Sequence, residues 1–106
     1  MDLKTWLSSS GIEFEDTTWK VPPAYPYGVY MDDSSTRGAD DKLFIAEHDV
    51  TIELYSDAKG TLVSAEADLE ALFISNAMAF ESLGKNWIES ERHWQSTYSI
   101  SYVEKI

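Results

Sequence analysis

Residues 44–55, Phe-Ile-Ala-Glu-His-Asp-Val-Thr-Ile-Glu-Leu-Tyr, decide the fold of this chain. Apolar and polar side chains alternate along them with a period of two residues, which is typical of a β-strand with one buried face. At helical spacing the same apolar residues would scatter around the helix, so the pattern predicts a strand over about residues 42–55. The face expected to be buried carries Phe44, Ala46, His48, Val50, Ile52 and Leu54.

A second strand is expected to precede this one and to pair with it as a long antiparallel hairpin over residues 27–55. Tyr27, Val29 and Met31 alternate before a polar cluster at residues 32–41, which is predicted to form the loop. The inner half of the hairpin, residues 27–31 with residues 50–54, is expected to build the core. All three prolines lie in residues 21–26, and since proline lacks the backbone donor this segment is expected to be an extended connector.

Two helices flank this hairpin in the predicted order of elements. A short helix over about residues 2–10 has Asp2 as its cap and Gly11 as its terminator. The main helix is expected over about residues 64–81, with Ser64 as its N-cap and Gly84 as its stop. Its apolar stripe comprises Leu69, Leu72, Phe73, Ala77 and Phe80.

The remaining strands are a weak one over residues 12–19 and a closing hairpin that begins at Trp87. Tyr98, Ile100 and Tyr102 are expected to pack beside Val50, Ile52 and Leu54, beneath the main helix. The chain is too short for two cores, so the prediction is a single α+β domain over residues 1–106. It has a mostly antiparallel sheet with a long β-hairpin, packed against one main helix, plus a short N-terminal helix.

Composition narrows the classes of function. The chain is 43% hydrophobic and has no cysteine, so it is expected to fold without disulfides or thiolate sites. Its net charge of -11 repels polyanions, which disfavours binding of nucleic acid or anionic lipid. The first residues lack the pattern of a signal peptide, and no stretch approaches the roughly 20 apolar residues of a membrane span. A soluble protein that is not exported is expected.

Motifs that would indicate catalysis or a cofactor are absent from the sequence. His48 and His93 have no second histidine or cysteine at ligand spacing, so no metal site is predicted. His48 is interpreted as a partly buried, hydrogen-bonded histidine, and His93 as an edge or turn residue. The aspartates within residues 32–41 do not match an EF-hand and are interpreted as a solvated hairpin tip. No enzyme and no cofactor are therefore predicted, although a hydrolase or metal enzyme using His48 or these aspartates stays open as an alternative.

A resemblance to a known family lies in the strand patterns. Residues 26–30 (Pro-Tyr-Gly-Val-Tyr), 38–42 (Gly-Ala-Asp-Asp-Lys) and 47–55 resemble the tail-completion or tail-terminator (head-tail joining) proteins of long-tailed phages and prophages. Residues 87–91 and the closing aromatic strand are similar to the same group. The resemblance implies a structural protein that terminates the tail tube as a homo-oligomeric ring, six-fold by analogy. It implies tail-tube and connector proteins as partners. It also implies that the protein is in the host cytoplasm during assembly and then at the head-tail junction of the virion.

The hairpin is the expected site of assembly. A strand that extends beyond the core it packs on leaves unpaired backbone N–H and C=O groups at its edge. These groups bind water or pair with a strand of another chain. The residues predicted to form the oligomer or partner interface are Asp32, Asp33, Arg37, Asp40, Asp41, Lys42 and Phe44. Acidic side chains gathered on one face could line a ring that DNA crosses without adhering. The alternative is a small acidic prophage adaptor or regulator that binds a host protein one to one.

Overall fold

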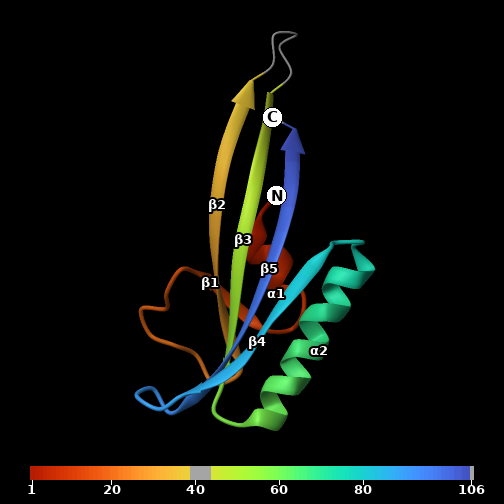
Figure 1. Ribbon diagram of the computed structural model, residues 1–106. Coiled ribbons are helices and arrows are strands. Elements are labelled where there is room, and N and C mark those ends of the chain that lie inside the picture. The colour runs from red at the N-terminus through yellow and green to blue at the C-terminus, as the bar shows by residue number, and fades with distance from the viewer. Residues whose placement is uncertain (39–43, 106) are drawn as a thin grey trace.

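The computed structural model describes residues 1–38 and 44–105, and in these residues the fold is α+β. Five strands form one sheet in the order β1-β2-β3-β5-β4, in which only β1 runs parallel to its neighbour (Figure 1). The predicted fold class is confirmed. The elements are α1 (Leu3–Ser8), β1 (Glu13–Asp16), β2 (Tyr27–Gly38), β3 (Phe44–Ser56), α2 (Lys59–Ser75), β4 (Phe80–Ile88) and β5 (His93–Lys105).

The main core lies between the sheet and both helices, which cover the same face. Val50, Ile52 and Leu54 of β3 and Tyr98 and Ile100 of β5 are at most 1% exposed, as the alternation predicts. The helices meet above them, where the Trp6 and Phe73 rings lie 6.0 Å apart. Fully burying one such aliphatic side chain contributes about 1.5–3 kcal/mol before the entropy cost.

The contribution of β2 to this core differs from the prediction. Tyr30 pairs with Ile52 and faces the helices, whereas Tyr27 and Val29 pair with Tyr55 and Glu53 and lie on the opposite face. The prediction that the whole segment 27–31 joins Val50, Ile52 and Leu54 was therefore wrong. Since neighbouring residues of a strand point to opposite faces, only one parity of β2 can face α2.

The loop predicted for residues 32–41 is also corrected. Residues 32–38 continue β2 and pair with β3 as far as Gly38 and Phe44. Their polar character reflects solvent on both faces of this part of the sheet, not a turn. Residues 39–41, the rest of the predicted loop, lie outside the described residues.

The main helix begins and ends earlier than predicted. It starts at Lys59 with Ala58 as N-cap, not at Ser64, because Leu62 and Ala65 extend the buried stripe toward the N-terminus. It ends at Ser75, where Ala77 adopts a left-handed φ of 52° and Met78 N–H donates to the Phe73 carbonyl at 2.8 Å, a Schellman motif. Phe80, the last residue of the predicted stripe, begins β4. Gly84, predicted as the stop of the helix, has φ 94° and lies at an irregularity within β4.

Three further predictions are confirmed in outline. The first helix has Asp2 as its N-cap, with the carboxylate accepting from Thr5 N–H, and Gly11 follows at φ 95°. The closing hairpin pairs β4 with β5, although it begins at Phe80 and not at Trp87. The weak strand predicted over residues 12–19 forms as the four-residue β1. Gly28 leaves room for the ring of the buried Phe14 on β1, because a Cβ there would lie 2.7 Å from its Cδ1.

Candidate functional site

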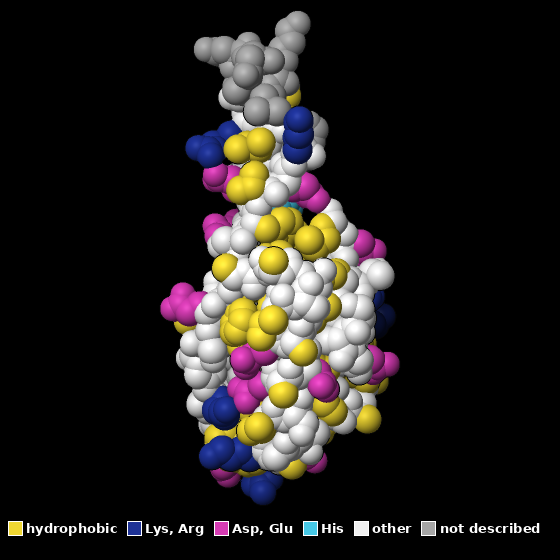
Figure 2. Space-filling model, turned by 90° about the vertical axis from the view of Figure 1, so that its right-hand side faces the viewer, with side chains coloured by type: hydrophobic (Ala, Val, Ile, Leu, Met, Phe, Trp, Pro, Cys, Tyr) yellow, Lys and Arg dark blue, Asp and Glu magenta, His cyan; other side chains and the backbone are white. Residues whose placement is uncertain are grey.

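Three strands of the sheet extend beyond the helices and form a projecting part, which we call the arm: residues 31–38 of β2, 44–49 of β3 and 101–105 of β5. β1 pairs with β2 only as far as Tyr30, and β4 pairs with β5 only as far as Ile100. Within the described chain, no other strand pairs with either outer edge of the arm. The molecule is accordingly long, 52 × 28 × 22 Å, and Figure 2 shows the arm as a narrow column above a wider body.

The arm contains the residues predicted for the partner interface that the structure describes. Asp32, Asp33 and Arg37 are strand residues of β2, and Phe44 begins β3. Phe44 is 48% exposed and lies over Gly38, where a Cβ would come within 2.6 Å of its ring. Asp40, Asp41 and Lys42 lie outside the described residues.

The two faces of the arm carry different side chains. The face continuous with the core has Ala46, His48 and Tyr102, whereas the opposite face has an Arg37–Glu47 ion pair and the exposed Val103. The carboxylates do not gather on one side: Asp49 and Glu47 lie on one face, Asp32 and Glu104 on the other, and Glu70 lies on α2. In the described part of the arm the acidic side chains are thus divided between the two faces, whereas the predicted channel lining has them on one.

His48 ties the three strands together at the root of the arm. Its Nδ1 lies 2.8 Å from Asp32 of β2, and its Nε2 lies 3.1 Å from Glu104 of β5. Its ring stacks on Tyr102 with centroids 4.4 Å apart and planes 6° from parallel. The side chain is 11% exposed, so the prediction of a partly buried, hydrogen-bonded histidine is confirmed. Both carboxylates accept a hydrogen bond only when both ring nitrogens carry hydrogen.

Two titratable groups beside His48 are shifted by this environment. A hydrogen bond from the amino group of Met1 lowers the pKa of Glu104, and His48 contributes less to the same shift. Burial raises the pKa of Tyr102 to about 12, and the negative charges of Asp32 and Glu104 add to the shift. The root of the arm is thus a region of fixed charge and stacked rings, suited to keeping the three strands in register.

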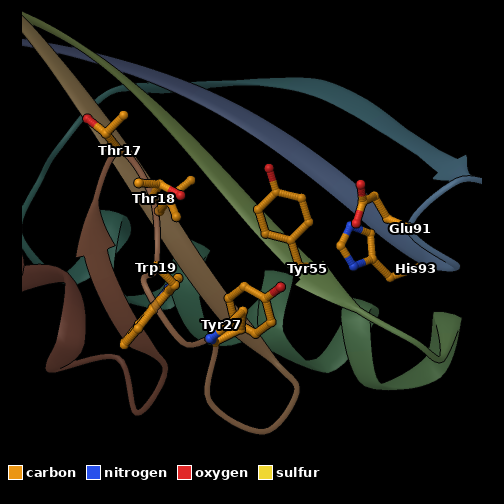
Figure 3. A pocket seen from close by; sticks show the side chains of 9 residues that line it. Thr17, Thr18, Trp19, Tyr27, Tyr55, Glu91 and His93 are labelled. Atoms are coloured by element: carbon orange, nitrogen blue, oxygen red, sulfur yellow. The ribbon is translucent and has the colours of Figure 1, made fainter.

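A second site lies on the face of the sheet opposite the helices, at the end away from the arm. An open pocket of about 200 Å³ is lined by the rings of Trp19, Tyr27 and Tyr55, with Glu91 and His93 at its other end (Figure 3). The loop between β1 and β2 brings Trp19 there, and the indole N–H donates to the Gly28 carbonyl at 2.9 Å. Burial raises the pKa of Tyr55 to about 12.

The sequence did not reveal this pocket, because its walls come from three segments that are far apart in the chain. His93 was predicted to be an edge or turn residue, but it is 6% exposed. It begins β5 and packs against Tyr55, with ring centroids 4.8 Å apart. The concentration of aromatic residues near residues 19–27 was the one available signal, and alone it did not indicate which residues would meet.

Comparison with models of known protein families finds no match, and comparison with curated protein sequences finds none either. Neither described helix combines the length and the apolar character needed to cross a lipid bilayer. In residues 1–38 and 44–105, no three histidine, aspartate or glutamate side chains converge as metal ligands would.

Proposed function

We propose that this protein is a structural assembly protein, and that the arm is the surface through which it joins its partners. The observation that supports this proposal most is that, among residues 1–38 and 44–105, no further strand pairs with the two outer edges of the arm. Exposed edges of this kind accept a strand from another chain, with main-chain hydrogen bonds supplying affinity and side chains supplying specificity.

The finer form of the proposal is a tail-completion or tail-terminator protein of a long-tailed phage or prophage. The family resemblance of residues 26–30, 38–42 and 47–55 supports this form, and of these residues Gly38 and residues 47–49 belong to the arm. A ring follows when each subunit offers its arm to the next through one repeated contact, provided that the rotation closes. The proposed partners are further copies of this chain, the tail-tube protein and the connector.

Arm variants test the proposal directly. Val103 lies on the arm and is 63% exposed, so Val103→Lys should fold normally while placing a charge in the contact. Ile74→Lys is the matched control, because Ile74 is 70% exposed on α2, away from the arm. Losing one buried valine contact should weaken assembly about tenfold, measured by mass photometry over a concentration series with and without tail-tube protein.

Three outcomes would count against the proposal. If the protein stays monomeric at high concentration both with and without tail-tube protein, the ring is excluded. A monomer in the absence of tail-tube protein alone does not exclude it, since many assembly proteins polymerise only on a partner. Equal behaviour of Val103→Lys and Ile74→Lys would exclude the arm as the contact. A stable one-to-one complex with a host protein would favour the adaptor instead.

For the phage role, electron microscopy of particles from a deletion strain should show overlong tubes or heads without tails.

A further inference from the structure

We infer that the pocket between Trp19 and His93 is a binding site for the guanidinium group of an arginine side chain on a partner protein. The inference does not depend on the arm. The pocket and the arm lie at opposite ends of β2 and β3, because Tyr27 pairs with Tyr55 at one end and Gly38 with Phe44 at the other.

The first observation is a buried nitrogen without a partner. His93 is 6% exposed, its Nδ1 lies 3.0 Å from the Tyr25 hydroxyl, and its Nε2 has no hydrogen-bond partner among the described residues. Leaving a buried polar atom unpaired costs free energy. Figure 3 shows one ring nitrogen of His93 on the side of Glu91. Nε2 is closed off from solvent in this structure, so an N–H donor in the pocket reaches it only after the His93 or Glu91 side chain turns.

The second observation is the charge at the same end of the pocket. Glu91 lines the pocket next to His93, and its carboxylate forms no ion pair with any cation in the described part of the chain. Its negative charge reaches across the pocket, where it adds to the burial that raises the pKa of Tyr27. With the chain's net charge of -11, this field favours a cation and repels an anion.

The third observation is the aromatic wall, which distinguishes arginine from lysine. Trp19 and Tyr27 meet edge to face at 6.1 Å, and Tyr55 lies 5.5 Å from Tyr27. A planar guanidinium stacks on such rings and presents several N–H donors in a fixed fork, so it could bond Glu91 and His93 together. A compact ammonium lacks the plane that stacks and is more strongly hydrated.

The volume of the pocket indicates that the ligand is a side chain of another protein and not a whole small molecule. A volume of about 200 Å³ lies below the roughly 300–1,000 Å³ of pockets that hold whole small molecules. One side chain fits this space, as arginine anchors do at the centre of protein interfaces. In the bound state Nε2 accepts from the guanidinium, and Nδ1–H consequently donates to the Tyr25 oxygen.

The test uses the full chain, labelled with ¹⁵N, and a capped arginine residue, N-acetyl-arginine N′-methylamide, as the probe. The signals followed are the Trp19 indole N–H and the His93 ring nitrogens. We expect both to shift saturably with a dissociation constant of about 1 mM, the range for a ligand of this size. Capped citrulline, which has the same shape without the charge, should bind about tenfold more weakly.

Matched variants separate binding from folding. Glu91→Gln should weaken the capped arginine about tenfold, whereas Glu89→Gln, two residues away and paired with the exposed Arg92, should leave it unchanged. His93→Phe keeps an aromatic ring and removes both nitrogens, so it should lose binding; if it does not fold, the Glu91 and Glu89 pair still decides. No saturable shift at Trp19 and His93, equal binding of citrulline, or equal effects of the two glutamate variants would each overturn the inference.

Discussion

Replacing Gly28 by alanine gives the sharpest test of how β1 and the pocket are held on the sheet. A Cβ at this position would lie 2.7 Å from Cδ1 and 2.9 Å from Cζ of Phe14, well inside the 3.5–4.0 Å at which carbon atoms attract. Phe14 is 1% exposed, so its ring has no open space to enter. The change should also disturb the pocket, because the Gly28 carbonyl accepts the Trp19 indole N–H.

The expected magnitude combines two opposing effects. Overpacking a filled core costs about 1–3 kcal/mol, whereas replacing glycine in a strand by alanine gains about 0.5–1 kcal/mol from the lost freedom of the unfolded chain. The net loss in the free energy of unfolding should therefore be about 1–2 kcal/mol. For a chain of this size that lowers the melting temperature by roughly 5–15 °C.

The assay is urea denaturation followed by circular dichroism and tryptophan fluorescence. Gly60→Ala is the control, because nothing lies within 4 Å of a Cβ there and the helix should gain up to about 1 kcal/mol. Phe14→Leu reduces the clash with an alanine at residue 28. The double variant should therefore lose about 1 kcal/mol less unfolding free energy than the sum of the losses in the two single variants. A Gly28→Ala protein as stable as the parent, or strictly additive losses, would refute this account of the contact.

Four further perturbations have defined outcomes. Ala77→Gly should raise the free energy of unfolding by about 1 kcal/mol, because Ala77 has a left-handed φ of 52° that is unfavourable for any residue with a side chain. As the control, Ala71→Gly on the exposed side of α2 should lower the free energy of unfolding by a similar amount in the same urea assay. Ile52→Asp should abolish folding, since it places a carboxylate at a position that is fully buried, and a cooperative melt near the parent's temperature would contradict the core assignment. Lys85→Met should cost about 2 kcal/mol by calorimetry, because it leaves the buried Glu66 carboxylate with only the Ser96 hydroxyl as a donor. Stability should fall as the pH rises from about 10 to about 12, because burial raises the pKa of Tyr55 and of Tyr102 to about 12. In that range the folded chain retains protons on these hydroxyls that the unfolded chain, whose tyrosine pKa is near 10, has lost. Urea midpoints at about pH 8 and about pH 11 measure the difference.

The sequence by itself determined the elements whose pattern is local and periodic. Alternation in residues 44–55 predicted β3 and its buried Ala46, Val50, Ile52 and Leu54, because a strand's period of two can be read along the chain. Phe44 was predicted on the same buried face, but it is 48% exposed because it lies on the arm, beyond the helices. Asp2 predicted the start of α1 for the same reason, since a helix cap depends on neighbouring residues, whereas the helix ends at Ser8, before the predicted end near residue 10. These elements were sufficient for the fold class.

Only the tertiary structure decided the features that depend on residues far apart in the chain. Residues 32–38 are polar, and what makes them a strand is their pairing with β3, which no local pattern contains. Glu66 is buried on α2 because Lys85 and Ser96 meet it from β4 and β5, a partnership invisible to a helical stripe of apolar residues. The pocket depends likewise on the β1–β2 loop, β3 and the start of β5 converging on one face of the sheet, because side chains from distant segments become neighbours only through the packing of the whole chain.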